Sequence, residues 1–405
     1  MDMTKELLQG KIPGKTTGIQ VKKSVCTICD PMTQCGLDLY VKDGRIIKVE
    51  GTKENPYSGG TLCSKGAAMR QYVYHPDRLR SPMKQKERGS GRFETISWEE
   101  ALDIIAARLQ QLKKVFGPES VCFFAGYTKY ERPYLHRLAH AFGSPNYMTE
   151  SSTCFQAMAM AQKLNFGLPG GPDVKNTRCL LAWSSNPFHT NTSLARNLMD
   201  AKERGLKIIV VDPRYSPMAA IADIHLQLRP GTDGALALAM ANVIISENLL
   251  DQEFVNEHTY GFEEYRSYIS DFTPEKGAEL TGVPAEKIIA AARLYAITKP
   301  AALMPSASPV VHHTNGVQNY RAAFALVALT GNYDVKGGNF VAPPSYLYQQ
   351  GGFLTREAQY PLVKTFDEMP PRVGVDKFPV WGKLVDEAQS MHLPFQINSE
   401  EPYPL

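Results

Sequence analysis

Four of the seven cysteines lie within the first 63 residues, and their spacing constrains the fold more than any other feature. They are Cys26, Cys29, Cys35 and Cys63, with two, five and 27 residues between them. Four thiolates at such positions hold either a [4Fe–4S] cluster or a zinc ion. Zinc ribbons usually use two close cysteine pairs, whereas this pattern has one close pair and a distant fourth ligand. The spacing favours a [4Fe–4S] cluster, with zinc or structural cysteines as the alternatives.

The composition is that of a globular protein with more than one domain. The chain has 405 residues, 43% of them hydrophobic and 21% charged, which exceeds what one core usually holds. A formal net charge of +3 is too small to indicate a nucleic-acid partner. The most apolar stretch, residues 235–245, is too short to span a membrane. Residues 1–18 have no apolar segment or arginine pair of an export signal, so we expect a cytoplasmic protein.

The N-terminal part is expected to fold around its cysteines. Residues 37–50 predict a β-hairpin, because two alternating apolar runs flank Asp43 and Gly44, which favour a type I′ turn. The hairpin lies between the third and fourth cysteines and would fold Cys63 back towards the others. We therefore expect a small, cysteine-ligated iron–sulfur domain over residues 20–80.

The remaining chain predicts α/β structure. Residues 81–150, which begin a helix at the capping pattern of residues 97–100, predict the first part of an incomplete α/β domain. Residues 151–335 alternate strands and helices, which indicates a doubly wound, Rossmann-like domain with a parallel sheet. Residues 336–405 are rich in Pro and Gly and predict an extended, loop-rich segment. The expected strands are 179–183, 207–211 and 301–304, and the expected helices are 193–203, 234–246, 285–297 and 318–329.

Three short motifs accompany the cysteine spacing: Cys-Ser-Lys-Gly at 63–66, His-Pro-Asp-Arg-Leu at 75–79 and Ser-Trp-Glu-Glu-Ala-Leu at 97–102. Together they resemble the dimethyl-sulfoxide-reductase family of molybdopterin oxidoreductases, and the resemblance runs through nearly all of residues 20–340. It implies a bis-molybdopterin guanine dinucleotide cofactor with Mo or W beside the [4Fe–4S] cluster. It also implies that Lys65 lies between cluster and cofactor; a surface lysine is the alternative.

Polar loops follow two of the expected strands. Ser184, Ser185 and Asn186 follow the first, and Asp212 and Arg214 follow the second. Loops at the carboxyl ends of parallel strands bind phosphates and nucleotides in α/β folds, although an ordinary turn is the alternative. The resemblance implies that the segment of Asp212 and Arg214 contacts guanosine. No GxGxxG motif is present, so the sequence does not support NAD binding.

Two further segments complete the expected cofactor contacts. Gly231 permits close backbone approach, Thr232 follows it, and Asp233 suits a helix N-cap. The resemblance adds guanine recognition by Asp233. It also places the pterin near His313, Asn315 and the segments 330–332 and 337–339.

Cys154 is the expected protein ligand of the Mo or W centre. It follows the Gly-Ser-Pro-Asn segment at 143–146, and the resemblance places a metal-ligating side chain there. A thiolate suits a soft, high-valent metal; a buried structural cysteine is the alternative, and it is our interpretation of Cys122 and Cys179. Phe155 stands where formate dehydrogenases of the family have His, which argues against formate.

Arg321 and Asp30 are the other expected catalytic residues. The resemblance places Arg321 near the substrate pocket, where it could hold an anion; an exposed helix arginine is the alternative. Asp30 follows Cys29, as in a tungsten hydratase of the family, and a carboxyl group beside a cluster could act as a general acid. A turn residue is the alternative, and the spacing to Cys35 is two residues longer than in the hydratase.

These residues favour the N-terminal portion of a redox catalytic subunit. A small-molecule substrate would exchange two electrons, often with an oxygen atom, at the metal. The electrons would pass the pterin, Lys65 and the cluster to an iron–sulfur electron-transfer subunit. A non-redox hydratase and a non-catalytic fragment are the competing hypotheses. The family continues into a second nucleotide-binding half and a C-terminal β-barrel domain that this sequence lacks, so we expect a second chain to supply them or the sequence to be truncated.

Overall fold

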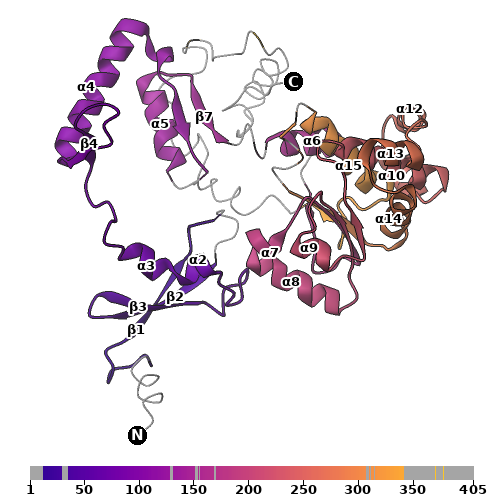
Figure 1. Cartoon of the computed structure of the whole chain (residues 1–405), viewed down its shortest axis with the longest axis horizontal. Helices are drawn as coiled ribbons and strands as arrows, with labels where there is room; N and C mark the ends of the chain where they lie inside the picture. The colour runs from indigo at the N-terminus through magenta and orange to yellow at the C-terminus, as the bar shows by residue number, and fades with distance from the viewer. Residues whose placement is uncertain are drawn as a thin grey trace. The chain divides into compact units, whose positions relative to one another are not determined.

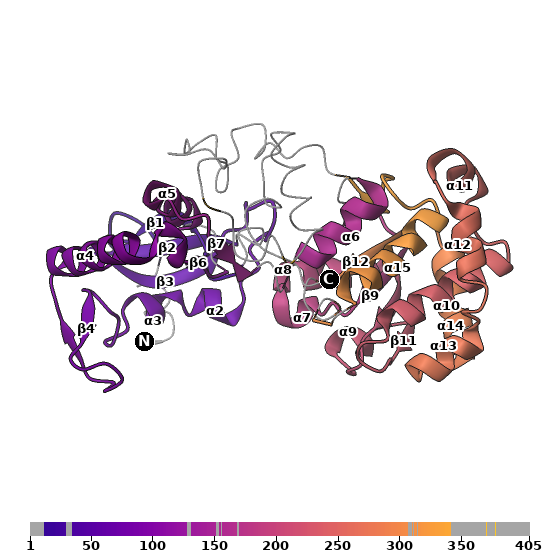
Figure 2. The same ribbon diagram turned by 90° about the horizontal axis from the view of Figure 1, so that it is seen from above.

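The structure is a computed structural model with two compact units, whose main boundary lies between Met148 and Thr149. It describes residues 12–29, 35–127, 131–150, 154, 156–167, 170–306, 310, 312–313, 315–341, 370 and 377. Figures 1 and 2 show the elements of each unit, which we describe separately. Among the described residues, no helix is both long enough and apolar enough to cross a membrane.

The N-terminal unit begins with a three-stranded antiparallel sheet. Its strands β1 (Gln20–Val25), β2 (Gly36–Lys42) and β3 (Arg45–Gly51) lie in sequence order. Asp43 and Gly44 join β2 to β3 with φ angles of 49° and 72°. Positive φ at both central residues defines the type I′ turn, so the predicted hairpin is confirmed. Two short helices follow, α2 (Ser64–Ala67) and α3 (Met69–Val73), and both contact β3.

The rest of this unit consists of two small sheets and two longer helices. The predicted capping pattern is confirmed, because the Ser97 hydroxyl accepts a hydrogen bond from the Glu100 amide at 3.0 Å at the start of α4. A small core gathers Phe123, Ala125, Ala139 and Tyr147. The elements are β4 (Met83–Gln85), β5 (Phe93–Thr95), α4 (Trp98–Phe116), η2 (Pro118–Ser120), β6 (Phe123–Ala125), α5 (Arg132–Phe142) and β7 (Tyr147–Thr149).

The second unit is built on a four-stranded parallel sheet. The strands are β9 (Cys179–Trp183), β10 (Lys207–Val211), β11 (Ile224–Leu226) and β12 (Ala301–Pro305), in the order β11-β10-β9-β12. Every pairing is parallel, so the predicted doubly wound sheet is confirmed. The sequence analysis missed β11, because three residues are too short to show a periodicity.

Helices cover both faces of this sheet, because successive side chains of a strand point to opposite sides. Leu180 and Ala182 of β9 pack in a core with α8 (Thr192–Glu203) and α9 (Pro217–Ala220). Leu181 and Trp183 pack in a second core with α10 (Asp233–Ser246), α14 (Ala285–Ile297) and α15 (Gly316–Leu329). A strand buried on both faces is typical of parallel α/β sheets. The remaining elements are β8 (Gly171–Pro172), β13 (Asn339–Phe340), α6 (Gln156–Phe166), α7 (Pro187–Thr190), α11 (Gln252–His258), α12 (Phe262–Tyr268) and α13 (Pro274–Thr281).

Candidate functional site

Two of the predicted cluster ligands lie side by side at one end of the N-terminal sheet. Val25 and Gly36 form the last pair between β1 and β2. Directly beyond it, the Cys26 amide donates a hydrogen bond to the Cys35 carbonyl oxygen at 2.9 Å. Antiparallel pairing therefore brings together two cysteines that are nine positions apart in the sequence.

The loop after β3 returns to the same end of the sheet. The Thr52 amide donates to the Gly36 carbonyl at 3.0 Å, and the Gly36 amide donates to the Ser58 hydroxyl at 3.3 Å. Gly51 approaches Gly60 so closely that a Cβ at position 51 would lie 2.2 Å from the Gly60 carbonyl oxygen. This loop leads directly into Cys63, the residue before α2.

The cysteine segments fit an iron–sulfur cluster, although the ligation stays a prediction. All four cysteines are partly exposed. Among the described residues, no three His, Cys, Asp or Glu side chains lie close enough to hold a metal ion. Thiolates approach one another when they bind metal, because binding and local folding are coupled. Lys65 is exposed on α2, and Asp30 lies outside the described residues.

The second unit has a topological switch point at β9. The chain passes from β9 to β10 on one side, whereas β12 pairs with β9 on the other side. In open α/β sheets, ligands bind where the strand order reverses, beyond the carboxyl ends of the strands. Ser184 follows β9 at this edge, and the Ser306 amide after β12 donates to the Trp183 carbonyl at 3.1 Å.

The loop after β9 carries polar groups that need a partner. Ser184 has a φ of 52°, a left-handed conformation that favours Gly, and its amide donates to the Val211 carbonyl at 2.7 Å. Within the described residues, the amide nitrogen and oxygen of the Asn186 side chain are buried without a hydrogen-bond partner. Buried polar atoms of this kind call for a ligand or ordered water. Ser185, between Ser184 and Asn186 in the sequence, is partly exposed.

The loop after β10 holds Asp212 in a fixed position. Its Oδ1 accepts a hydrogen bond from the Arg214 amide at 2.8 Å, and its backbone carbonyl lies 2.8 Å from Nε2 of His225. Asp212 is buried, whereas Arg214 is exposed. The predicted pair is therefore adjacent, with a rigid acid beside a solvent-facing base.

Asp233 is not the helix cap that the sequence suggested. Thr232 holds the N-cap position of α10, and its hydroxyl donates to the Arg229 carbonyl at 2.7 Å. Asp233 is the first helical residue, and its Oδ1 accepts a hydrogen bond from the buried Trp183 indole at 2.8 Å. Burial raises the pKa of Asp233, and hydrogen bonding to Trp183 and the charge of His313 oppose this shift. A buried, oriented carboxyl group is suited to recognition of a ligand that carries N–H donors.

Residues from α15 and the preceding loop join Asp233. Gly231 has a φ of 86°, and a Cβ there would lie 3.5 Å from the His313 ring. Nδ2 of the Asn315 side chain donates a hydrogen bond to Oδ1 of Asn319 at 3.4 Å. Nδ2 of Asn319 is buried without a partner in the described part of the chain. The sequence analysis missed Asn319, although its place one helical turn after Asn315 could have indicated it.

Cys154 belongs to the same electrostatic neighbourhood. Burial raises the pKa of Tyr320, and the charges of Asp233 and Cys154 raise it further. The Tyr320 hydroxyl donates to the Ser306 carbonyl at the switch point. Cys154 and Asp233 therefore both lie in the surroundings of Tyr320, and metal ligation by Cys154 stays a prediction. The flanking residues Ser151–Thr153 and Phe155 lie outside the described residues.

Arg321 has structural partners. This exposed side chain donates from Nε to Oδ1 of Asn165 at 3.4 Å and from Nη1 to Oε1 of Gln318 at 3.0 Å. Asn165 in turn donates to the Arg321 carbonyl at 2.9 Å. These bonds join α15 to α6, and the anion-binding role of Arg321 stays a prediction.

Asn332 and Asn339 lie in the expected pterin segments, and their side chains form hydrogen bonds with the backbone of β12. Oδ1 of Asn332 accepts from the Ala301 amide at 2.9 Å, and Asn339 exchanges two hydrogen bonds of 2.8 Å with the Leu303 backbone. Both amides are buried. They extend the hydrogen bonding of β12 at its open edge, which explains these asparagines structurally.

The two cysteines outside the predicted sites differ from each other. Cys179 is fully buried, as expected, and burial raises its pKa to about 12. Cys122 is exposed, so its interpretation as a buried structural residue is wrong. It precedes β6 rather than lying within it, and a strand of three residues shields little of its surroundings.

Comparisons with known proteins agree with this arrangement. The molybdopterin oxidoreductase family matches residues 78–375, and the molybdopterin oxidoreductase Fe4S4 domain matches residues 19–75. The dimethyl sulfoxide reductase DmsA of Escherichia coli is 34% identical over 415 residues, which cover 91% of this chain and 49% of DmsA. The alpha subunit of F420-dependent formate dehydrogenase 2 from Methanococcus maripaludis is 34% identical over 330 residues, which cover 78% of this chain and 46% of that subunit.

A solved structure supports the same fold. Acetylene hydratase from Pelobacter acetylenicus has a TM-score of 0.72 and 29% sequence identity, and the match covers 91% of this chain and 51% of the hydratase. The chain spans about half the length of the known relatives that it matches. The two matched domains indicate a [4Fe–4S] cluster and a molybdopterin cofactor with Mo or W. The chain belongs to the molybdopterin oxidoreductase family.

Proposed function

We propose that this chain forms the N-terminal part of the catalytic subunit of a molybdopterin-dependent oxidoreductase. The observation that carries the proposal is the set of buried polar groups at the switch point of the sheet. Asn186 and Asn319 each carry buried amide atoms without a partner among the described residues, and Asn319 lies against Gly234, the residue after Asp233. When bound, the Mo or W centre supplies two-electron or oxygen-atom-transfer chemistry.

The cofactor in this proposal is a bis-molybdopterin guanine dinucleotide. The Asp233 carboxylate would accept hydrogen bonds from guanine N–H groups, while the Trp183 indole holds it in place. Asp212, which is fixed by the Arg214 amide, would accept from the nucleoside. Asn186 offers one donor pair and one acceptor, which suits a phosphate or pterin edge. The contact to Asn186 would satisfy two buried polar atoms that have no partner in the described part of the chain.

Redox chemistry assigns roles to the remaining predicted residues. The Cys154 thiolate would ligate the metal, and the four N-terminal cysteines would hold the cluster. Lys65 would stand between cluster and pterin as a positive charge, which favours electron arrival on either side. Dimethyl sulfoxide, which the name of one relative mentions, is the first substrate candidate; formate, which the name of another mentions, ranks second because of Phe155.

An electron-transfer partner is part of this proposal. Several relatives are named as subunits, among them the thiosulfate reductase molybdopterin-containing subunit PhsA of Salmonella typhimurium, which is 33% identical over 341 residues. We expect an iron–sulfur subunit to receive electrons from the cluster, and a further polypeptide segment or chain to complete the pocket.

Metal content after strictly anaerobic purification tests the proposal. We expect about four Fe and one Mo or W per chain. Cys154→Ala should keep its iron but lose one sulfur neighbour of Mo or W in X-ray absorption, together with dye-linked turnover. Cys122→Ala is the matched control and should change neither. One zinc without iron would refute the cluster, and an unchanged metal environment in Cys154→Ala would refute the ligand.

A non-redox hydratase is the second candidate, because the fold matches acetylene hydratase. The two functions differ in their need for an electron donor or acceptor during turnover. We expect the enzyme that contains this chain to reduce dimethyl sulfoxide or oxidise formate only with a redox dye. Hydration of acetylene without electron exchange, lost in Asp30→Asn, would favour the hydratase instead.

A further inference from the structure

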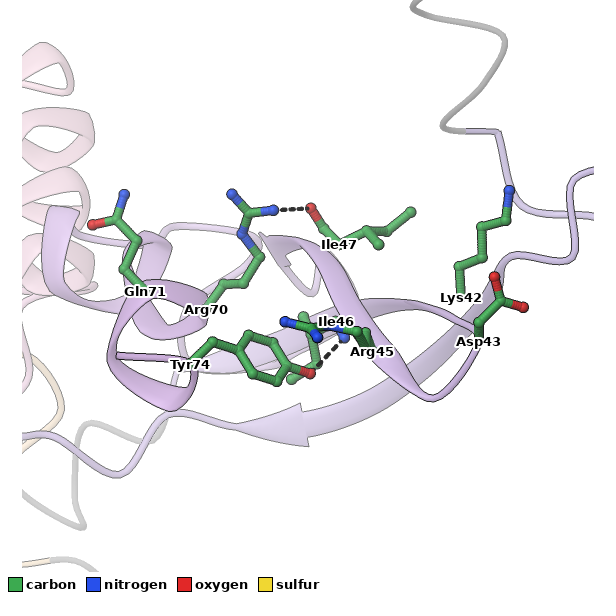
Figure 3. A pocket seen from close by; sticks show the side chains of 8 residues that line it. All are labelled: Lys42, Asp43, Arg45, Ile46, Ile47, Arg70, Gln71 and Tyr74. Atoms are coloured by element: carbon green, nitrogen blue, oxygen red, sulfur yellow. Dashed lines mark hydrogen bonds between the residues drawn. The ribbon is translucent and has the colours of Figure 1, made fainter. Parts of the chain in front are cut away.

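A cationic hollow of about 420 Å³ lies on the N-terminal unit, between the β2–β3 turn and α3 (Figure 3). Ile46 and Ile47 line its apolar part. Lys42, Arg45 and Arg70 supply positive charges around it. The turn and the cysteine pair lie at opposite ends of β2, so the hollow is separate from the predicted cluster ligands.

The side chains around the hollow are held in place before anything binds. The Arg45 guanidinium lies 4.9 Å from the centre of the Tyr74 ring. The Tyr74 hydroxyl accepts a hydrogen bond from the Ile46 amide at 2.8 Å, and Nη1 of Arg70 donates to the Ile47 carbonyl at 3.1 Å (Figure 3). Side chains that are already ordered lose less conformational entropy on binding.

The net positive charge of the chain is concentrated in residues 1–92, which include the residues that line the hollow. Residues 1–92 contain 17 Lys and Arg against nine Asp and Glu, a net charge of +8, whereas the whole chain carries +3. Asp43 is the one carboxylate on the edge of the hollow, against three cations. Such a field attracts acidic partners and raises their association rate.

A second arginine–tyrosine pair lies on this unit, outside the lining of the hollow. Tyr72 on α3 is 64% exposed, and the Arg78 guanidinium lies 4.9 Å from the centre of its ring. Leu79 next to it is 73% exposed. Tyr and Arg are the residues that most often carry the binding energy of protein–protein interfaces. The Arg45–Tyr74 pair brings this combination to the hollow itself, which suits a protein partner.

We propose that this surface, which comprises Lys42, Arg45, Ile46, Ile47, Arg70 and Tyr74, binds an acidic protein segment. The segment inserts one apolar side chain over Ile46 and Ile47, and its flanking carboxylates pair with the arginines. An apolar floor favours such a side chain over a phosphate, and the Asp43 carboxylate opposes a dense array of phosphates. The proposal goes beyond the redox function and does not depend on it.

Fluorescence anisotropy with the anaerobically purified, iron-loaded chain tests this inference. The probe is a labelled short peptide of glutamates around one central phenylalanine. We expect saturable binding that weakens with salt and with replacement of the phenylalanine by alanine. Arg45→Glu with Arg70→Glu should weaken binding about tenfold or more. Arg88→Glu with Arg92→Glu, an equal charge change at exposed arginines of the β4–β5 hairpin, should change it less than about twofold.

Folding and alternative ligands are controlled in the same experiment. Each variant is compared at equal iron content, and Lys42→Glu, at the exposed last residue of β2, gives a weaker version of the effect without removing a side-chain hydrogen bond. Equal losses in both arginine pairs would overturn the site, because the binding would then follow net charge alone. Binding to anionic phospholipid vesicles that needs Arg45 and Arg70, without binding of the peptide, would overturn the protein partner in favour of a lipid surface.

Discussion

Replacing Asn186 by leucine is expected to stabilise the cofactor-free protein while it weakens cofactor binding. The amide nitrogen and oxygen of Asn186 are buried without partners in the described residues. Each buried polar group left without a hydrogen bond costs about 1–3 kcal/mol. Removing both groups, less about 1.5 kcal/mol for imperfect packing of leucine, should raise the free energy of unfolding by about 0.5–4.5 kcal/mol. The midpoint of thermal unfolding should rise by roughly 2–4 °C for each kcal/mol.

Asn332→Leu is the matched control, because this asparagine is also buried but fully bonded. Its Nδ2 donates to the Thr330 hydroxyl at 2.7 Å, and its Oδ1 accepts from the Ala301 amide at 2.9 Å. Leucine would remove both bonds and leave the Ala301 amide buried without an acceptor. We expect a loss of about 2–4 kcal/mol in the free energy of unfolding, opposite in sign to the effect at Asn186.

Both variants are measured in cells that cannot make molybdopterin and in cells that can. Urea unfolding of the cofactor-free proteins gives the stability difference, and Mo or W per chain gives cofactor retention. Asn186→Leu should gain stability in the first host and lose metal in the second. A destabilisation comparable to that of Asn332→Leu would refute the reasoning, because it would show that the Asn186 amide is already satisfied within the protein.

Two further predictions concern single residues of the sheet. Ser184→Gly should raise the free energy of unfolding by about 0.5–1 kcal/mol, because Ser184 has a φ of 52° that costs a non-glycine residue strain; a loss in urea unfolding would show that its hydroxyl is needed. The Cys179 thiol stays protonated in the fold up to a pKa of about 12, against 9.0 unfolded. Stability should therefore fall by about 1.4 kcal/mol per pH unit as the pH rises above 9. Cys179→Ala should remove this contribution to the slope, and iodoacetamide should label the exposed Cys122 before Cys179, as mass spectrometry can show.

Features encoded by neighbouring residues were predictable from the sequence. Asp43 and Gly44 favour positive φ themselves, and Ser97 meets the Glu100 amide within one helical turn. Each of these structures depends on interactions only a few residues apart, so the sequence pattern contains the whole cause. The strands of the parallel sheet were predictable for a related reason, since burial on both faces requires a continuous apolar run.

Features that depend on distant contacts were not predictable. Asp233 matches the pattern of a helix N-cap. Its carboxylate instead accepts a buried hydrogen bond from the indole of Trp183, fifty positions earlier in the sequence. Asn332 belongs to a segment that resembles a pterin contact, but its amide completes β12. Asn319 carries no motif and gains its place only when α15 packs beside α10. In each case the deciding partner comes from another element of the fold, which no local pattern records.

The strand order of the second unit also determines how late in synthesis its sheet can be completed. β9 and β12 enclose the switch point, yet roughly 120 residues of chain separate them, and Asn332 and Asn339 secure β12 only after a further helix. During synthesis, the ribosome must therefore release nearly 340 residues before β12 is paired with β9 and secured by Asn339. Of the proposed cofactor contacts, Asn186, Asp212 and Asp233 precede β12 in the sequence, whereas Asn319 follows it. The order of the strands thus makes the last of these proposed contacts available only late in synthesis.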